Sequence, residues 1–470
     1  MTGRALALAG IWLALAGAAP LPLAPPPPDL ARLVPFAAAP LDKPPVEIDV
    51  AMPASAVDLP PFPPAPLVFP AAAPPSAVPP PARALPCIGA WTGAPQEELE
   101  CGRSRYANGH YEDAVRQLES AARGAGDIAR EARYWLAESY LKLGRIEQAD
   151  WRFRQVTQDG TRDDWGVWSL HGSGWTALRL NDAPRARDTF ATLVNGPAPA
   201  PLQAWGRFGL GLAAYAMGRY EEAEQAWSQL APRVPAPLVR DLFFWHGEAL
   251  GRIGNYTQAE ATLRRFTDGG PHQLISSGLL RLGWWTLAGG RAEEAARAFR
   301  AYMTLPPGTL LRQTSGAPEA DWVRAGLALA LLQAGDAAGA RDAAASLQAS
   351  RSPLALPVLL RMASASAEAP APEMETIIQE ALAAQLPPAQ RAWLLIAKGE
   401  MARAAGNRDD ARTHFDLARK AAPGTPIAAH ATLRLARTNF ELREFRQALA
   451  DVSPLVTGGP AELRVAALAL

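Results

Sequence analysis

Apolar residues recur at helical spacing from about Gln96 onward, in a sequence rich in Ala, Leu, Arg and Glu. The helical runs are interrupted by a repeated pattern: a Gly or Asn, one further residue, an aromatic or apolar residue, and an Ala three positions later. Clear copies begin at Gly109, Gly144, Gly218, Gly254 and Gly290, and weaker ones at Asp182, Gly335, Gly406 and Arg443. Most copies are about 36 residues apart, a period typical of paired-helix repeats.

Each part of this pattern has a mechanical reason. The Gly can take the left-handed conformation that ends one helix, and the small Ala lets the two helices of a hairpin approach closely. One hairpin cannot bury its own apolar face, so neighbouring hairpins must stack. The sequence therefore predicts an all-α fold, an α-solenoid of about ten helical hairpins over residues 87–470. The spacing doubles between Gly335 and Gly406, which predicts a degenerate repeat near 354–386.

Residues 130–153, which read REARYWLAESYLKLGRIEQADWRF, resemble a tetratricopeptide repeat. The signature positions are occupied by Leu136, Ala137, Tyr140, Gly144, Ala149 and Phe153. The copies that contain YWLAESY and LRLGWW are similar to repeats of bacterial cell-envelope proteins, among them the periplasmic coordinator associated with the Tol–Pal system and an outer-membrane assembly lipoprotein. The resemblance implies a scaffold for a protein or peptide partner, with envelope assembly, division or export machinery as candidate partners.

The first residues predict export. Arg4 precedes an uncharged apolar run from Ala5 to Ala16, and Ala16-Gly17-Ala18 fits the small-x-small pattern of a signal peptidase site. We therefore expect a signal peptide over residues 1–19 and a periplasmic or otherwise exported protein. An uncleaved N-terminal membrane anchor is the alternative.

Residues 20–86 are rich in proline, which lacks a backbone donor and fixes φ, so that neither helix nor sheet can run through them. We expect an extended, disordered linker before the solenoid. Apolar residues are spaced through this linker, among them Phe36, Ile48, Phe62, Val68 and Phe69. They are either short docking motifs or incidental residues of a spacer.

The cysteines fit the same compartment. Cys87 ends the linker and Cys101 lies in the first predicted helix. In an exported protein a disulfide between them would persist and would attach the linker to the first repeat. Two unpaired thiols are the alternative.

Charge and motifs exclude several classes of function. The 46 Lys and Arg residues balance the 46 Asp and Glu residues, so no net field favours nucleic acid as a partner. The sequence has no His-Glu-x-x-His, no phosphate-binding Gly-Lys-Ser/Thr loop and no metal-ligand spacing around its six histidines. We expect no enzyme activity, no cofactor and no metal.

Tryptophan is the feature that exceeds what the repeat needs. Seven indoles fall at three positions of the predicted first helices: Trp135, Trp175, Trp205, Trp245, Trp284, Trp322 and Trp393. Positions seven residues apart share a helix face, and the resemblance implies that first helices line the concave groove. These indoles either line that groove, where proline-rich peptides and sugar rings stack on aromatic faces, or pack one hairpin on the next.

Two further expectations concern charge and the chain end. Charged residues near the same face are Arg103, Glu138, Arg207, Glu248, Arg281 and Glu400, and we expect them to be solvated. Residues 461–470 begin another apolar helix. This helix docks back on the array, meets a partner, or belongs to a repeat that the sequence does not complete.

The leading functional hypothesis is a non-catalytic scaffold of the bacterial cell envelope that holds an extended peptide or partner protein in its groove. The alternative is binding of peptidoglycan or another polysaccharide by the groove tryptophans. A third hypothesis is that the proline-rich arm folds back into the chain's own groove.

Overall fold

The computed structural model describes residues 61–70, 94–159, 163–306, 318–355, 357–359, 361–362, 374–383 and 386–470. The predicted signal peptide, residues 1–19, and Cys87 lie outside these ranges. The described residues pack as two units, whose boundary falls between Met362 and Ala363. This boundary lies inside the region where the repeat pattern predicts a degenerate copy.

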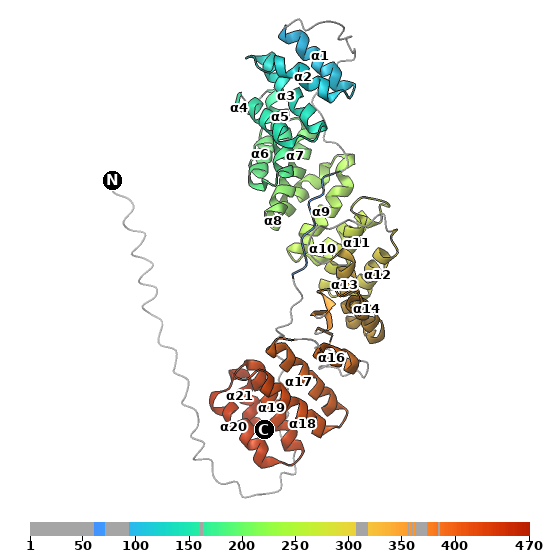
Figure 1. Ribbon diagram of the computed structural model, residues 1–470, viewed down its shortest axis with the longest axis vertical. Helices are drawn as coiled ribbons and strands as arrows, with labels where there is room; N and C mark the ends of the chain where they lie inside the picture. The colour runs from blue at the N-terminus through green and yellow to red at the C-terminus, as the bar shows by residue number, and fades with distance from the viewer. Residues whose placement is uncertain are drawn as a thin grey trace, which may run out of the picture. The chain divides into compact units, whose positions relative to one another are not determined.

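The larger unit consists of residues 61–70 and helices α1 to α14, which follow one another as antiparallel hairpins (Figure 1). The odd-numbered helices are the first helices of the hairpins: α1 Pro95–Ala107, α3 Asp127–Lys142, α5 Asp164–Arg179, α7 Ala200–Ala216, α9 Val239–Arg252, α11 Ile275–Ala288 and α13 Glu319–Gln333. The second helices are α2 Tyr111–Ala121, α4 Ile146–Asp159, α6 Ala183–Asn195, α8 Tyr220–Leu230, α10 Tyr256–Thr267, α12 Ala292–Met303 and α14 Ala337–Ala349. Two 3-10 turns, Ala231–Arg233 and Ala236–Leu238, join α8 to α9.

The smaller unit is built in the same way from α16 to α21. Its helices are α16 Met374–Ala383, α17 Pro388–Ala404, α18 Arg408–Ala421, α19 Pro426–Glu441, α20 Phe445–Gly458 and α21 Ala461–Ala469. The final helix docks on the array: Leu463, Ala466 and Ala467 pack against a core formed with α19 and α20. Val465 and Leu468, on the opposite face of α21, are exposed. All the described secondary structure is helical, and none of the described helices is both long and apolar enough to cross a bilayer.

The predicted turns have the predicted backbone conformation. The seven turn glycines Gly109, Gly144, Gly218, Gly254, Gly290, Gly335 and Gly406 have φ between 72° and 85°. At the two weak copies without a turn glycine, Asn181 and Arg443 take the same left-handed conformation, with φ of 57° and 63°. The turn is therefore set by the stacking of the hairpins even where an L-residue must bear the local strain.

In five hairpins an aromatic side chain four residues after the repeated Ala fills the space between the helices. Phe153, Phe190, Trp227, Phe299 and Phe415 hold this position and are fully buried. Several of these rings lie against glycines of first helices, where a Cβ would overlap the ring, as at Gly172, Gly283 and Gly399. The stack therefore uses glycine on one helix to receive an aromatic ring from the next.

Candidate binding groove

Residues 61–70, PFPPAPLVFP, lie across the first helices of the larger unit (short blue trace in Figure 1). Phe62 contacts rings on α11 and α13, Ala65 is hydrogen-bonded to α7, and Phe69 contacts a ring on α5. The segment therefore runs opposite to the order of the repeats. Because it reaches from α13 to α5 within eight residues, it must be extended.

Phe62 is enclosed by aromatic rings and two guanidinium groups. Its ring stacks on Trp284 at 5.2 Å between centroids, and meets Trp285 and Trp322 edge-on at 5.5 Å and 5.4 Å. The guanidinium carbons of Arg252 and Arg281 lie 5.4 Å and 5.5 Å from its centroid. Aromatic pairs contribute about 0.5–1.5 kcal/mol each beyond area burial, and cation–π contacts add about as much. This cage makes Phe62 the main anchor of the segment.

Main-chain hydrogen bonds hold the residues after Phe62. Arg252 donates from Nη1 to the carbonyl oxygen of Phe62 at 2.8 Å and from Nη2 to that of Pro63 at 2.5 Å. The amide N–H of Ala65 donates to the phenol oxygen of Tyr215 at 2.8 Å. These bonds recognise backbone, so they act on any extended chain that offers two successive carbonyls and one N–H in this register.

The second half of the segment is held by a second aromatic anchor. The Phe69 ring lies edge-on to Trp175 at 6.2 Å, and the guanidinium carbon of Arg179 lies 5.5 Å from its centroid. Gln273, just before α11, donates from Nε2 to the Phe69 carbonyl oxygen at 3.1 Å. Between the anchors, Pro64, Ala65 and Leu67 form one wall of a hollow whose other walls come from α5 to α8.

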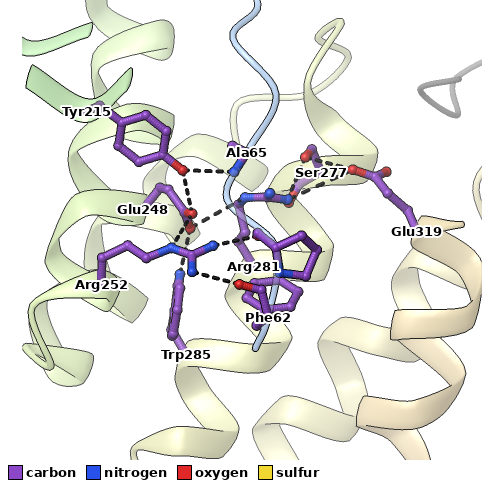
Figure 2. Close-up of polar contacts among 10 residues, drawn as sticks. Phe62, Ala65, Tyr215, Glu248, Arg252, Ser277, Arg281, Trp285 and Glu319 are labelled. Carbon is purple, nitrogen blue, oxygen red and sulfur yellow. Dashed lines mark hydrogen bonds and ion pairs between the residues drawn. The ribbon is translucent and has the colours of Figure 1, made fainter. Parts of the chain in front are cut away.

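A buried carboxylate, Glu248, orients the groups that bind the segment (Figure 2). Its Oε1 accepts from the Tyr215 hydroxyl at 2.8 Å and from Arg252 Nε at 2.9 Å, and its Oε2 accepts from Trp285 Nε1 at 2.9 Å. Tyr215 and Arg252 then bind the backbone of the segment, and Trp285 forms part of the Phe62 cage. One acidic side chain therefore fixes three residues of the groove.

The charges around Glu248 keep it ionised. Burial alone would raise its pKa, but Arg281 and Arg252, together with the hydrogen bonds from Trp285 and Arg252, outweigh this and hold the pKa below its ordinary value. Burial, and then the negative charge of Glu248, raise the pKa of Tyr215 well above its ordinary value. The phenol therefore stays protonated at neutral pH. Its O–H donates a hydrogen bond to Glu248, and its oxygen accepts one from the N–H of Ala65.

A second buried carboxylate continues this network. Arg281 is 1% exposed and lies with its Nε 3.4 Å from Glu248 Oε2. Its Nη1 donates to the Ser277 hydroxyl at 2.7 Å, and this hydroxyl donates to Glu319 Oε1 at 2.8 Å (Figure 2). This series of polar contacts, which runs from α9 through α11 to α13, fixes the Arg281 guanidinium beside the Phe62 ring.

Within the described ranges, no three or more His, Cys, Asp or Glu side chains are placed to hold a metal ion. Tyr215, Arg252 and Trp285 instead donate to Glu248, and Tyr215 and Arg252 also bind the backbone of residues 61–70. Chemically, the arrangement can hold an extended chain but presents no nucleophile activated by a neighbouring base.

Comparison with known families gives the repeats a name. The tetratricopeptide repeat family matches residues 99–151, 172–237 and 244–309, and a second form of this repeat matches residues 392–416. The chain is a tetratricopeptide repeat protein. This class is typically non-catalytic and works as a scaffold for interactions between proteins.

Solved structures match this tetratricopeptide repeat (TPR) protein only at low similarity. A TPR protein from Parabacteroides merdae matches with a TM-score of 0.35 and 13% identity over 73% of this chain and 98% of that chain. PilF of Pseudomonas aeruginosa matches with a TM-score of 0.37 and 16% identity over 46% of this chain and 92% of that chain. The apo form of the quorum sensor NprR of B. thuringiensis matches with a TM-score of 0.39 and 11% identity over 76% of this chain and 98% of that chain. Among curated proteins no match is found. These likenesses carry no argument about the partner of this TPR protein.

Of the seven tryptophans that the sequence indicated as candidate groove residues, three contact residues 61–70. Trp284 and Trp322 enclose Phe62, and Trp175 meets Phe69. Trp175 also donates from its indole N–H to Nε2 of the buried His171 at 3.0 Å, which fixes the orientation of its ring. These three residues come from different repeats, and the superhelix brings them to one segment.

The other four tryptophans are packed among helices. Trp245 is fully buried among Tyr215, Trp227 and Phe244. The buried residues Trp135, Trp205 and Trp393 are likewise at most 4% exposed. Three of the seven indoles thus contact residues 61–70 and four pack among helices, and their role in binding a partner stays a prediction. Among the described residues, no observation favours a sugar site over a peptide site.

The expectation that the charged residues are solvated is wrong for Glu248 and Arg281. Both are buried because they pair with each other across neighbouring first helices, which removes the cost of an isolated buried charge. Cys101, on α1, is in a disulfide bond. Since Cys87 lies outside the described residues, the predicted pairing of these two cysteines stays a prediction.

Sequence reasoning missed Tyr215, Arg252, Trp285 and Gln273. The Glu248 and Arg252 pair carries a detectable signal, because an acid four residues before an arginine on a helix can pair with it. Trp285 follows Trp284 directly and so falls off the predicted stripe. Tyr215 stands at the end of its first helix, where its hydroxyl reaches the next repeat only after the hairpins stack.

Proposed function

We propose that this TPR protein is a non-catalytic scaffold of the bacterial cell envelope whose larger unit binds an extended peptide segment of a partner protein. The observation that supports it most is the placement of residues 61–70 across the first helices. An extended chain there is held by two aromatic anchors and by hydrogen bonds to its backbone. A groove that already accommodates one such chain has the chemistry to accommodate another.

The composition of residues 61–70 keeps the entropy cost of such binding low. Five of its ten residues are proline, which restricts the free chain and so lowers the entropy lost on binding. Proline has no backbone N–H. Among the described hydrogen bonds, the groove accepts a single backbone N–H of the segment, that of Ala65. A proline-rich partner therefore leaves few donors unsatisfied in the groove.

A binding measurement tests this function. A fluorescein-labelled peptide of residues 59–72 would be titrated against the full chain carrying Phe62→Ala and Phe69→Ala, and its anisotropy recorded. We expect saturable binding that weakens at least about tenfold when Trp284→Ala is added, since one ring contact and its buried area are lost. Absence of saturable binding would contradict the proposed groove.

The proposed location rests on the N-terminal export pattern and on the disulfide of Cys101, because disulfides persist in oxidising compartments. Cell fractionation with maleimide labelling, before and after reduction, tests it. The expected result is a protein in the envelope fraction whose thiols react only after reduction. A cytosolic protein with freely reacting thiols would contradict the proposal.

A further inference from the structure

The groove of the larger unit matches residues 61–70 in three separate ways: two rings fit two aromatic sites, two carbonyls fit one guanidinium, and one N–H fits one phenol. These contacts define a recognition pattern along the occupant. An aromatic residue comes first, a proline follows it, a free N–H comes three residues after the aromatic, and a second aromatic comes seven residues after it. Pro61, Pro64 and Pro66 are exposed, so the groove does not read their side chains closely.

We propose that the partner of this TPR protein presents a proline-rich segment with this two-aromatic pattern, and that residues 61–70 are the chain's own copy, which such a partner must displace. The inference rests on the proposed function and deepens it by naming the ligand chemistry and the competitor.

The groups that contact the segment do not depend on it for all their hydrogen bonds. Tyr215, Arg252 and Trp285 each also donate to Glu248, and these bonds can remain when the segment leaves. The two Nη atoms of Arg252 that bind the segment would then be hydrated. No buried ionic group is stranded by opening the groove, so the segment is not required to complete the buried network.

The segment also has the character of a ligand rather than of a core element. It contains no helix or strand, and most of its side chains are only half-buried. Residues 71–93, a stretch of 23, separate it from Ala94, the residue before α1. Because the segment belongs to the same chain as the groove, its effective concentration there is on the order of millimolar. A free peptide therefore competes at a disadvantage.

The test compares three full-length proteins with one probe, the labelled peptide of residues 59–72. The proteins are the wild type, the Phe62→Ala and Phe69→Ala double variant, and a control variant, Pro66→Ala, in which an exposed residue of the same segment is changed. We expect the double variant to bind the probe at least about tenfold more tightly than the wild type, because its own segment no longer competes. The control should bind like the wild type.

A second probe tests the pattern itself. In the double variant, a peptide with Phe62→Ala should bind at least about tenfold more weakly than the parent peptide, and a peptide with Pro66→Ala should bind equally well. Equal binding of the Phe62→Ala peptide would overturn the aromatic pattern.

The outcomes separate the proposals. Equal probe affinity of the wild type and the double variant overturns the competition and leaves the proposed function standing. Failure of every protein to bind the probe overturns the proposed function itself. Light scattering settles where the segment acts: a dimeric wild type and a monomeric double variant would show exchange of segments between two copies, which overturns competition within one chain.

Discussion

The two units of the molecule contain the same arrangement of one glutamate and two arginines, and they use it differently. In the larger unit Glu248 pairs with Arg252 four residues on and with Arg281 of the next first helix. In the smaller unit Glu400 pairs with Arg403 at 2.9 Å and with Arg434 of the next first helix at 2.8 Å. Each glutamate stands eleven residues before the repeated Ala of its hairpin, Ala259 or Ala411, so the two glutamates occupy the same position of the repeat.

The difference lies in what covers the charges. Glu248 is fully buried, and Arg252 extends beyond it to the backbone of residues 61–70. The side chain of Glu400 is 15% exposed, and Arg403 extends instead to Glu441 at 3.5 Å. The same kind of pair therefore joins neighbouring hairpins in one unit and, together with the aromatic cage, contacts residues 61–70 in the other. We therefore expect substitutions to have different effects in the two units at the glutamates, Glu248 and Glu400, and at Arg252 and Arg403.

The largest expected difference comes from removing each carboxylate charge. Glu248→Gln leaves Arg252 and the buried Arg281 without their anion, and we expect it to lower the free energy of unfolding by about 3–5 kcal/mol. The matched change Glu400→Gln, at a partly exposed pair, should cost about 1 kcal/mol or less. Urea unfolding followed by circular dichroism measures both. Equal losses would show that the segment adds nothing to the burial of the Glu248 charge.

Acid should destabilise both units, through one buried histidine in each. Burial lowers the pKa of His171 to about 3, and burial with the charge of Arg434 lowers that of His430 to about 4. Below pH 6.5 the unfolded chain binds a proton at each site that the folded chain does not. Stability therefore falls as the pH falls, by at most about 2 kcal/mol per histidine at pH 5. The loss from His430 levels off near pH 4, and that from His171 continues toward pH 3.

Urea midpoints between pH 7 and pH 4 measure this effect in the wild type and in His171→Asn. The variant should show a shallower dependence of unfolding free energy on pH. An unchanged slope would mean that His171 takes up its proton over the same pH range in the folded and the unfolded chain, which contradicts its burial as an acceptor for Trp175.

Where the repeat alone determines the packing, the two units should respond alike. A Cβ at Gly283 would overlap the ring of Phe299, and a Cβ at Gly399 would overlap that of Phe415. We expect Gly283→Ala and Gly399→Ala each to cost about 1–3 kcal/mol, because the rings must leave their positions between the helices. Thermal unfolding of the two variants checks this. A cost at Gly283 but none at Gly399 would separate the packing of the units as well as their use.

The smallest predicted effect distinguishes the arginines. Arg252→Lys removes a guanidinium that bridges Glu248 and two carbonyls, and it should weaken probe binding by the Phe62→Ala, Phe69→Ala chain by about 1–1.5 kcal/mol, or roughly tenfold. Arg403→Lys, in the same background, should leave that affinity unchanged. Anisotropy titration of the labelled peptide measures both. A matching loss in Arg403→Lys would place the probe in the smaller unit.

Much of the fold was predictable because the repeat depends on residues that are close together in the sequence. The spacing of Gly109, Gly144 and Gly218 predicts hairpins, and the structure places each of these residues at a left-handed turn. The doubled spacing after Gly335 marks the region in which the two units divide. Turns and helix faces depend on residues within one or two helical turns, so periodicity is sufficient to find them.

The site was predictable only in part. The sequence pointed to aromatic residues on first helices and named Phe62 and Phe69 as candidate docking residues of the arm. Which indoles face the segment depends on how far each hairpin rotates against the next, and no local pattern records that rotation. Trp245 and Trp284 both lie on first helices, α9 and α11, yet the first is enclosed by three rings and the second meets Phe62.

By itself, the sequence determined the helical repeat, its turns, its aromatic content and the proline-rich composition of the arm, since each follows from backbone preferences and spacing along the chain. Only the tertiary structure decided that Glu248 and Arg281, 33 residues apart in sequence, share one buried network beneath Phe62. The physical reason is that a charge can be buried only where its partner arrives from another helix, and stacking of the hairpins sets that meeting.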